Sequence, residues 1–465
     1  MRGVKTLWTS NELVAACGGK ASDEFVASGV AFDSREIGQG DLFFALKGET
    51  SDGHHYVDQC FANGAAGAVV SEPINHPHIL VSNTARALDA LGTVSRNRTQ
   101  AKIIGITGSA GKTGTKEALF SALDRSSRGK AHRSVKSYNN HVGVPLSLAR
   151  MPADAQYGVF EMGMNHSGEL SALTQMVRPD IAIITTIAPA HIGFFKDETE
   201  IAVAKAEIFE GLVVGGTAII PADNLHYPLL RAAAEKYATH VVSFGFAETA
   251  DVRAIDYVTA VDGSSLVTAK LRGGTMCYTL SQPGKHWIAN SLAVLAAVEA
   301  LGADLASAGL ALAELGGMAG RGARHTIKAA NGEALLIDES YNANPASMAA
   351  TISELTNAGG KRRLAVLGAM KELGDQSDHY HLGLAAPLAA AEVDYAIFVG
   401  EEMQILAETL KSGLEGPRKF AHCGNAQEAL DLLRHNLSDG DVVLVKGSNS
   451  MGLSKIVSAL VEGDR

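Results

Sequence analysis

The residues with the strongest chemical signature lie together in the run TGSAGKT, where Gly108 and Gly111 precede Lys112 and Thr113. A lysine at this spacing can reach the outer phosphates of a nucleotide, and a threonine hydroxyl can hold Mg²⁺. The glycines let the backbone approach phosphate oxygens and adopt positive φ. The first N–H groups of a helix have no intrahelical partner, and the helix dipole favours an anion there. The spacing therefore predicts a phosphate-binding loop.

The elements around this run support the same interpretation. Residues 103–106 form an apolar stretch short enough for a buried strand, and residues 118–123 carry apolar side chains at helical spacing. Ile106 stands where the full motif G-x-x-x-x-G-K-[ST] has its first glycine, so a glycine-rich turn with an incidental lysine is the alternative. The strand–turn–helix order favours nucleotide binding, with contacts expected from Gly108, Ser109, Ala110, Gly111, Lys112, Thr113 and Gly114. The dinucleotide motif G-x-G-x-x-G is not present there, which disfavours a dehydrogenase.

Two further polar residues follow predicted strands. Glu161 comes directly after YGVF, and His191 follows IAIITTI by a few residues. In parallel sheets ligands gather at the carboxyl ends of the strands, so both positions favour a metal or phosphate role. Ordinary loop residues also occupy such positions, and the pattern leaves that alternative open.

Lys205 occupies an unusual position for a charged residue. In EIAVAKAEIFEGL the apolar helical stripe contains Ile201, Ile208 and Phe209, and at about 100° per residue Lys205 falls within it. The side chain can extend outward to solvent. Alternatively, burial depresses the lysine pKa, and the neutral amine could react with carbon dioxide to give a carbamate with oxygen ligands for Mg²⁺. The sequence pattern alone leaves both interpretations open.

Length and composition predict a multidomain α/β protein. A chain of 465 residues with 49 glycines and 46% hydrophobic residues is too long for one core. We expect three domains, over residues 1–100, 101–323 and 324–465. The net charge of −10 disfavours a nucleic-acid surface, and the four cysteines lie far apart without metal-ligand spacing. No apolar run resembles a signal core or a membrane span, so we expect a cytoplasmic protein without membrane insertion.

Apolar runs alternate with helical patterns along the chain, which predicts doubly wound α/β units and a parallel sheet in the central one. In the first unit, polar residues at strand ends (Ser34, Arg35 and Lys47) could bind a phosphorylated or carboxylated ligand, although solvated loop residues are the alternative. The expected strands lie at residues 30–32, 42–46, 158–160, 181–187, 218–220, 241–244, 335–337, 364–367, 396–399 and 442–445, and the expected helices at 56–63, 86–98, 347–355, 403–412, 426–437 and 453–461.

Several motifs together carry a family resemblance. They are FDSREIGQGDLFFALKGE, TGSAGKTGTKE, NNHVGVPLSL, FEMGMNHSGEL, AHIGFF, AKAEIFEGL, DESYNANPASM and VKGSNSMG, and they resemble the Mur ligases, more narrowly the UDP-N-acetylmuramoyl-tripeptide:D-alanyl-D-alanine ligases. The preceding ligase type of that pathway carries an Asp-Asn-Pro-Arg motif that this chain lacks. The resemblance implies a small N-terminal α/β domain for the UDP-substrate, a central P-loop parallel-sheet ATPase domain and a C-terminal Rossmann-like α/β domain.

The resemblance also implies an activity in peptidoglycan synthesis. ATP would phosphorylate the terminal carboxylate of UDP-MurNAc-tripeptide, and the amine of D-alanyl-D-alanine would attack the acyl phosphate. ATP and Mg²⁺ are the implied cofactors, the two small-molecule substrates are the implied partners, and we expect a monomer. A related ligase that adds another amine and a nucleotide-binding protein without ligation are the alternatives.

Residue roles follow from the same resemblance. Thr113 and Glu161 would hold one Mg²⁺, while His191 and a Lys205 carbamate would hold a second. Asn290 would contact adenine, Arg321 the phosphates and Asp338 the ribose. The implied catalytic set is Lys112, Glu161, His191, Lys205 and Arg321. The implied substrate contacts are Ser34, Arg35 and Lys47 at the UDP end, and Asn139, Asn140, Tyr341, Asn342, Asn344, Lys446 and Ser448 elsewhere. Because they come from three units, the ligands would close an open arrangement.

Four positions depart from the pattern of this ligase type. Gly114 replaces a second hydroxyl residue after the loop lysine, and Trp287 stands where an asparagine is usual. Ala369 stands at a usual aspartate, and Asn449 stands where an arginine is frequent. None of the four removes a group needed to form an acyl phosphate, but they leave the detailed roles of the third unit open.

Overall fold

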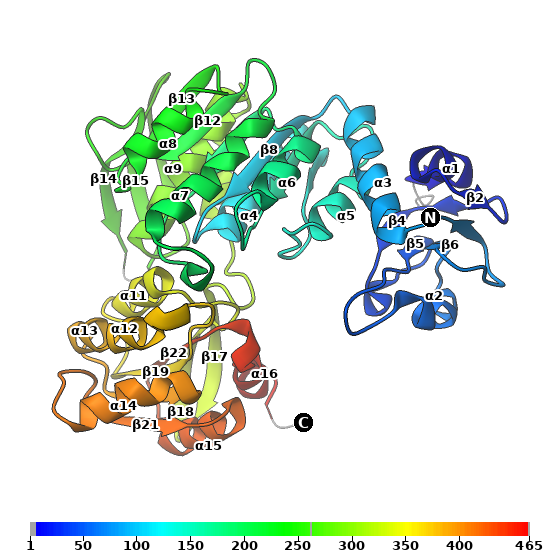
Figure 1. Cartoon of the computed structure of the whole chain (residues 1–465). Coiled ribbons are helices and arrows are strands. Elements are labelled where there is room, and N and C mark those ends of the chain that lie inside the picture. Colours follow the sequence, from blue (N-terminus) through cyan, green and yellow to red (C-terminus); the bar gives the residue numbers. More distant parts are fainter. Residues whose placement is uncertain (1–5, 261–262, 464–465) are drawn as a thin grey trace.

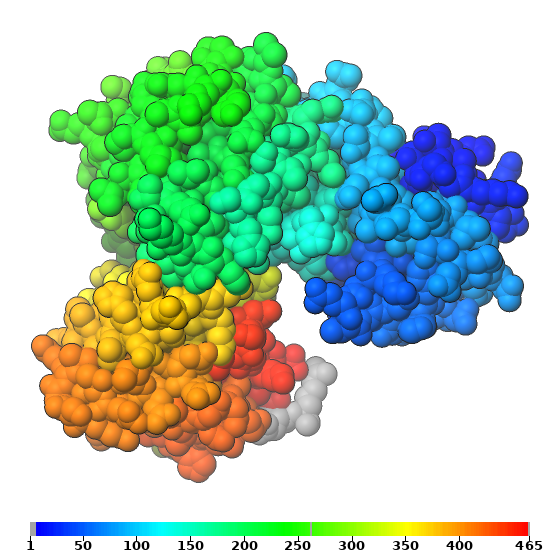
Figure 2. All heavy atoms as spheres, in the orientation of Figure 1, coloured from blue at the N-terminus to red at the C-terminus, as the bar shows by residue number. Residues whose placement is uncertain are grey.

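The computed structural model describes residues 6–260 and 263–463, which fold into three bodies that each contain a β-sheet. Figure 1 shows the central body with the N-terminal body at its side and the C-terminal body below it. In Figure 2 the N-terminal body touches the central one, while open space separates it from the C-terminal body. Within the described ranges, no helix is both long and apolar enough to cross a bilayer.

The N-terminal body contains a five-stranded sheet in the order β2-β7-β6-β5-β4, in which β2 is antiparallel to β7 and the other pairs are parallel. The predicted strands and helices of this body are confirmed with shifted ends, while helix α1 and the short strands β1, β2, β3, β6 and β7 are additional. The elements are β1 (Trp8–Thr9), α1 (Ser10–Cys17), β2 (Lys20–Ala21), β3 (Val26–Ala27), β4 (Gly29–Ala31), β5 (Asp41–Phe44), α2 (Val57–Ala62), β6 (Gly67–Val70), β7 (His78–Leu80) and α3 (Thr84–Arg98).

Helix α5 (Gly143–Ala149) joins this body to the central one. The indole nitrogen of Trp8 donates to the Ala149 carbonyl oxygen at 2.8 Å, and Leu146 packs into the same apolar cluster as Trp8. The contact spans 141 residues of chain. It therefore fixes the N-terminal body to the central sheet through side chains as well as through the connecting helix α3.

The central body contains a nine-stranded sheet in the order β16-β15-β14-β13-β12-β11-β8-β10-β9. Strand β8 lies inside the sheet, between β11 and β10, so the loop that follows β8 emerges from the interior of the molecule. The strands are β8 (Lys102–Thr107), β9 (Ala131–Arg133), β10 (Tyr157–Glu161), β11 (Ile181–Ile184), β12 (Thr217–Pro221), β13 (His240–Gly245), β14 (Val252–Thr259), β15 (Ser265–Leu271) and β16 (Gly274–Leu280).

The predicted parallel central sheet is confirmed for strands β8 to β14, and two antiparallel strands extend it at one edge. Strands β9 to β14 and β8 run parallel, but β15 pairs antiparallel with β14 and β16 antiparallel with β15. Five residues separate β14 from β15 and two separate β15 from β16, whereas a parallel neighbour would need a crossover of a dozen or more residues. Buried and exposed positions alternate along β15, as expected for a strand with one covered face.

Helices cover both faces of the central sheet, and each face has its own apolar cluster. Helices α4 (Lys112–Ser127), α9 (Lys285–Ala300) and α10 (Leu305–Ala313) belong to one cluster. Helices α5, α6 (Glu169–Val177), α7 (Glu198–Ala206) and α8 (Tyr227–Ala234) belong to the other. This is the crossover arrangement that the sequence predicts.

The C-terminal body contains a six-stranded sheet in the order β17-β18-β22-β19-β20-β21, with β17 antiparallel and the other pairs parallel. The predicted strands and helices are confirmed, and β17, β21, α12 and α13 are additional. The elements are β17 (Ala323–Ala329), β18 (Gly332–Glu339), α11 (Pro345–Glu354), β19 (Arg362–Gly368), α12 (Ser377–Leu382), α13 (Ala385–Ala390), β20 (Tyr395–Val399), α14 (Gln404–Lys411), β21 (Phe420–Cys423), α15 (Ala426–Asn436), β22 (Asp441–Lys446) and α16 (Ser454–Val461).

Candidate functional site

The carboxyl ends of the central and C-terminal sheets contribute to one cleft of about 1090 Å³. Glu161 at the end of β10, Thr185 after β11 and Pro221 at the end of β12 line it from the central body. Glu339 at the end of β18 and Lys446 at the end of β22 line it from the C-terminal body. Open α/β sheets bind ligands at this end of their strands, and here two such ends face each other.

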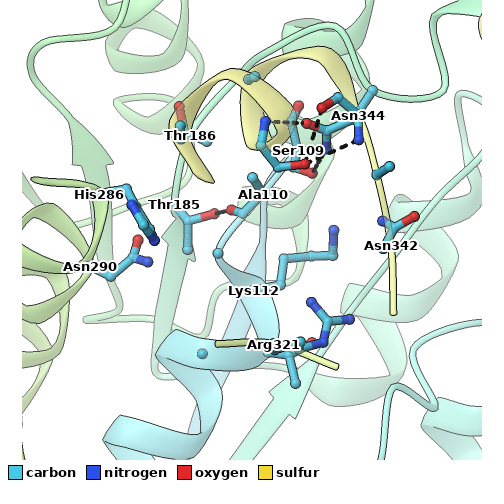
Figure 3. A pocket seen from close by; sticks show the side chains of 18 of the residues that line it. Ser109, Ala110, Lys112, Thr185, Thr186, His286, Asn290, Arg321, Asn342 and Asn344 are labelled. Atoms are coloured by element: carbon cyan, nitrogen blue, oxygen red, sulfur yellow. Dashed lines mark hydrogen bonds between the residues drawn. The ribbon is translucent and has the colours of Figure 1, made fainter. Parts of the chain in front are cut away.

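The loop between β8 and α4 forms one wall of the cleft and has a tightly determined shape (Figure 3). Gly108 has φ 149°, and a Cβ there would lie 1.9 Å from the Thr185 hydroxyl oxygen. Gly111, with φ 82°, precedes the first residue of α4. The Ser109 amide donates to the Thr186 carbonyl oxygen at 2.8 Å. Glycines are therefore required at both positions, and the predicted strand–turn–helix is confirmed.

Lys112 and Thr113 begin α4 and face Glu161. The Thr113 hydroxyl donates to Glu161 Oε2 at 2.9 Å, and the Asn139 amide donates to Glu161 Oε1 at 2.8 Å. Burial and the nearby Arg321 guanidinium lower the pKa of Lys112, while Glu161 opposes that shift. In Figure 3 the cationic ends of Lys112 and Arg321 extend toward the same part of the cavity. The arrangement offers oxygen donors for a hard cation beside two positive charges for phosphates.

Lys205 lies on α7, which gives way to a 3-10 turn at Glu207–Gly211 rather than continuing as one α-helix. The side chain is 1% exposed, lines the cleft and hydrogen-bonds to no described residue. Burial, with a further contribution from Lys112, lowers its pKa well below the ordinary lysine value. Of the two interpretations that the apolar stripe leaves open, the structure has the buried lysine rather than one extended to solvent. A larger neutral fraction makes the amine a better nucleophile.

His191 lies at the contact between the central and C-terminal bodies. It has φ 59°, lines the cleft, and its Nδ1 pairs with the carboxylate of Glu372. That pairing lowers the pKa of Glu372. Next to it the Gly193 amide donates to the Glu372 carbonyl oxygen at 2.9 Å, and a Cβ at Gly193 would lie 2.6 Å from the Gly374 nitrogen. The two backbones therefore touch with no room for a side chain.

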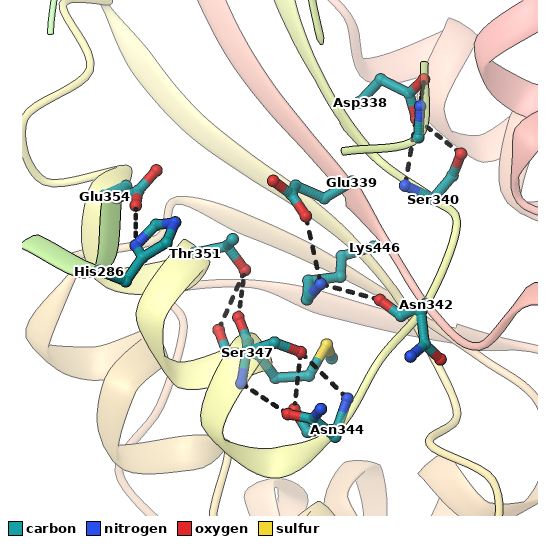
Figure 4. A network of polar contacts seen from close by, with 12 residues as sticks. His286, Asp338, Glu339, Ser340, Asn342, Asn344, Ser347, Thr351, Glu354 and Lys446 are labelled. Carbon is teal, nitrogen blue, oxygen red and sulfur yellow. Dashed lines mark hydrogen bonds and ion pairs between the residues drawn. The ribbon is translucent and has the colours of Figure 1, made fainter. Parts of the chain in front are cut away.

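The C-terminal side of the cleft is a network of polar side chains (Figure 4). The Lys446 amine is buried, lies 3.4 Å from Glu339 Oε2 and donates to the Asn342 carbonyl oxygen at 2.9 Å. Burial lowers the pKa of Lys446, and Glu339 opposes that shift. Asn344 caps α11 and donates from its amide to the Ser109 carbonyl oxygen at 3.2 Å, so it reaches the phosphate loop.

Arg321 lies in the segment between the two bodies and is held over an aromatic ring. Its guanidinium carbon is 4.3 Å from the centre of the Tyr341 ring, and its Nη2 donates to Ser137 Oγ at 3.4 Å. Most residues predicted from sequence thus line one cleft, namely Ser109, Ala110, Gly111, Lys112, Thr113, Gly114, Asn139, Glu161, His191, Lys205, Asn290, Arg321, Tyr341, Asn342, Asn344, Lys446 and Ser448.

Gly108 and five other predicted residues do not line the cleft. Ser34, Arg35 and Lys47 lie in the N-terminal body, where Arg35 pairs with Asp33 at 2.6 Å and Lys47 lies 3.7 Å from Asp52. Asn140 accepts from the Gly143 amide at the start of α5. Asp338 is buried, and its carboxylate accepts from the Gly320 amide and from Ser340. Side chains alternate along β18, so Glu339 faces the cleft and Asp338 does not.

The cleft contains residues that sequence reasoning misses. Thr185 and Thr186 shape the phosphate loop, and their polar side chains at the end of an apolar strand were the available signal. His286 lies 3.1 Å from Glu354 across the two bodies, and Lys371 and Glu372 enter from the segment that follows β19. Of the departures, Asn449 lines the cleft and Ala369 is fully buried beside Gly400.

Comparisons with known proteins agree with this architecture. Three family models match the chain: "Mur ligase family, catalytic domain" over residues 26–102, "Mur ligase middle domain" over residues 106–298 and "Mur ligase, glutamate ligase domain" over residues 323–449. A UDP-N-acetylmuramoyl-tripeptide--D-alanyl-D-alanine ligase of Bacillus subtilis is 32% identical over 447 residues, which cover 95% of this chain and 94% of that protein. The chain belongs to the Mur ligase family.

Solved structures of Mur ligases resemble the whole molecule. MurF from Acinetobacter baumannii is 32% identical with a TM-score of 0.82, and the alignment covers 98% of this chain and 99% of that one. MurF ligase from Thermotoga maritima, solved in complex with ADP, is 25% identical with a TM-score of 0.75, over 93% and 97% of the two chains. The predicted three-domain α/β fold is therefore confirmed as the Mur ligase fold.

Proposed function

We propose that this chain is an ATP-dependent amide ligase of peptidoglycan synthesis that joins D-alanyl-D-alanine to UDP-MurNAc-tripeptide. The observation that carries the proposal is the composition of the cleft. From the central body it contains the phosphate loop with the oxygen ligands of Thr113 and Glu161, and the buried Lys205. From the C-terminal body it contains the cationic side chains of Lys371 and Lys446. The named activity of the Bacillus subtilis relative, which aligns over 95% of this chain, supports the choice of substrates.

The first step is phosphoryl transfer. An oxygen of the substrate carboxylate attacks the γ-phosphorus of ATP, the bond to the β–γ bridging oxygen breaks, and ADP leaves with the electron pair. Lys112 and the amides of the loop would neutralise the β- and γ-phosphates, and Arg321 would approach them from the interdomain segment. Tyr341 beneath Arg321 would keep the guanidinium oriented. These fixed charges stabilise the negative charge that gathers on the transferred group.

The second step is attack by the dipeptide amine. The neutral amine nitrogen adds to the carbonyl carbon of the acyl phosphate, inorganic phosphate leaves, and the nitrogen loses a proton to give the amide. Lys446 and Ser448 lie on the C-terminal wall with Asn342 and Tyr341, where they would bind the dipeptide carboxylate. An ammonium facing a carboxylate in a partly desolvated site is the appropriate chemistry.

The residues present fit Mg²⁺. The Thr113 hydroxyl and the Glu161 carboxylate are 2.9 Å apart, nearly buried, and supply the oxygen ligands that this ion prefers. Bound there, Mg²⁺ would offset phosphate charge. A second site would use His191 and a Lys205 carbamate. Within the described residues no group of three or more His, Cys, Asp and Glu could hold a metal, so that second site depends on the modified lysine.

The N-terminal body would hold the UDP end of the substrate. Glu36, next to Ser34 and Arg35, pairs with the Lys136 amine and accepts from the Tyr138 hydroxyl at 2.7 Å. Ser137 and Asn139 of the same segment line the cleft. A long substrate could therefore run from the N-terminal body along residues 134–140 to the phosphate loop. Domains over residues 1–100, 101–323 and 324–465, a monomeric state, cytoplasmic location and closure on ligand binding complete the proposal.

The test is product analysis with purified protein, Mg·ATP, UDP-MurNAc-tripeptides and D-alanyl-D-alanine. We expect ADP release only when both other substrates are present, and a product whose mass equals tripeptide plus dipeptide minus water. L-amino acids offered in place of the dipeptide test for a ligase with another amine. ATP binding without ADP formation in every mixture would overturn the ligase assignment in favour of a binding protein.

A further inference from the structure

We propose that Trp287 is a nucleotide-contacting residue of this ligase, whose indole N–H donates to the α-phosphoryl group of ATP. In this role it replaces a side-chain hydroxyl at position 114, where the chain has glycine. The inference rests on the proposed function, because it requires ATP in the phosphate loop. It names a donor that the loop and the residues already assigned do not supply.

Helices α4 and α9 meet at the phosphate loop. Gly111 and Gly114 are three residues apart at the start of α4, and Trp287 and Asn290 are three residues apart near the start of α9. A Cβ at Gly111 would lie 2.9 Å from Asn290 Oδ1, and a Cβ at Gly114 would lie 2.6 Å from the Trp287 ring. Residues three apart share a helix face, so one face of α9 meets the first turn of α4 at two matched points.

The indole of Trp287 differs from the other indole of the chain. Trp8 is fully buried, and its Nε1 donates to the Ala149 carbonyl oxygen. Trp287 is 8% exposed and lines the cleft. Its Nε1 hydrogen-bonds to no described residue, and it is not among the described fully buried atoms without a partner, so it keeps some solvent access. An indole N–H can only donate, which makes an anionic oxygen its natural partner.

The position of the ring selects the part of the nucleotide. Lys112 and Thr113 precede Gly114 along α4 and serve the outer phosphates and the metal in a loop of this kind. The edge of the six-membered ring packs on Gly114, one residue further along the helix, and Asn290 lies beside the loop glycine. Trp287 therefore borders the sugar-side end of the phosphate chain. Its apolar body also excludes water from the charged group, which strengthens the remaining hydrogen bonds.

Gly114 and Trp287 then form a complementary pair. A serine at 114 would overlap the ring, and an asparagine at 287 would leave the space beside Gly114 open. Together the two substitutions would return a hydroxyl to the loop and make room for it. Gly114→Ser should weaken ADP binding more than tenfold, and adding Trp287→Asn should restore it to within about threefold of the native value. Additive losses in the double variant would overturn the pairing.

A direct readout is available because the chain has two tryptophans. In a Trp8→Phe background all indole emission comes from Trp287, and saturating Mg·ADP should change its intensity or wavelength. The matched control is Trp287→Phe, in which the emission of Trp8 should not change when ADP is added. Trp287→Phe keeps a ring and removes the donor, so ADP affinity should fall about threefold to tenfold while the melting temperature changes little.

Calorimetry of ADP binding distinguishes a failure of the proposed function from a failure of the role of Trp287 alone. No heat of ADP binding by the native chain would overturn the proposed function and this inference together. Binding of normal affinity with unchanged Trp287 emission, or with native affinity in Trp287→Phe, would overturn the role of Trp287 alone. Far-UV circular dichroism of each variant verifies that losses do not come from unfolding.

Discussion

The two walls of the cleft are built in different ways. On the central wall the phosphate loop is tied to its own sheet, by the Ser109 amide on Thr186 and by Thr113 on Glu161. The C-terminal wall reaches the central one through a few contacts between the bodies. The Asn344 amide donates to the Ser109 carbonyl oxygen, Glu372 pairs with His191, Glu354 lies beside His286, and the Gly193 amide donates to the Glu372 carbonyl oxygen. The difference indicates that phosphate chemistry uses a preformed site, whereas the second wall engages by contacts that can open.

The strongest test of this contrast removes a charge from the preformed wall. Lys112→Ala should lower kcat at least about a thousandfold, because the site loses a fixed cation aimed at the transferred phosphate. The ADP-release assay measures it. Lys102→Ala is the matched control, since that lysine is exposed and pairs with Asp180 on the opposite end of β8. A loss below about tenfold in Lys112→Ala would contradict a preformed phosphate site.

Lys205 tests whether the preformed wall needs a covalent modification. Lys205→Ala should lower turnover at least about a hundredfold, since the carbamate would supply charge and ligands for the second metal. Added acetate or formate should restore part of the rate by occupying the vacated position. Lys196→Ala, ahead of the same helix, should remain active. Unchanged turnover in Lys205→Ala would mean that the buried lysine has only a structural role.

Substitutions at Asn344 test the contact between the C-terminal wall and the phosphate loop. Asn344→Ser keeps a good N-cap for α11 but cannot extend an amide to the Ser109 carbonyl oxygen. The KM for ATP should rise about threefold with kcat little changed, because one interdomain hydrogen bond is lost. Asn344→Ala also removes the cap and should cost about 1 kcal/mol of unfolding free energy. A large fall in kcat for Asn344→Ser would place this residue with the preformed chemistry instead.

The smallest expected effect is a change in how the free energy of unfolding depends on pH, caused by His132 in the central body. Burial lowers the pKa of His132 on β9 to about 4, and the ring contacts the Ser147 carbonyl oxygen. Between the ordinary histidine value near 6.5 and about 4, the unfolded chain binds the proton and the folded chain does not, so stability falls as pH falls. The slope is at most about 1.4 kcal/mol per pH unit. His132→Gln should flatten this part of the stability curve, and urea titrations at several pH values would measure it.

The features that sequence predicts well are those decided by neighbours along the chain. The phosphate loop depends on two glycines between a strand and a helix, and the structure has both elements. The apolar stripe around Lys205 offers burial as one of two interpretations, and the structure buries the residue in a helix that tightens at Glu207. Local spacing carries this information because it fixes which side of an element a residue occupies.

The features that sequence misses depend on contacts between distant segments. Asp338 and Glu339 both end a predicted strand, but the pleat turns only Glu339 into the cleft. No local signal pairs His191 with Glu372, which lie 181 residues apart. Strands β15 and β16 extend the parallel central sheet as antiparallel strands. No local sequence feature shows that they pair with this sheet. The distance of Ser34 and Arg35 from the cleft depends on how whole domains are arranged.

The meeting of Gly193 and Gly374 has a consequence for how this family member can diverge. The main chains of the central and C-terminal bodies are in direct contact there, without side chains between them. The contact therefore does not depend on the chemical type of the neighbouring side chains. Even one methyl group at Gly193 would act as a spacer, wedging the walls apart by the breadth of a carbon atom. Other residues between the two bodies can be substituted, but the position of Gly193, where the main chains are in contact, accepts only glycine.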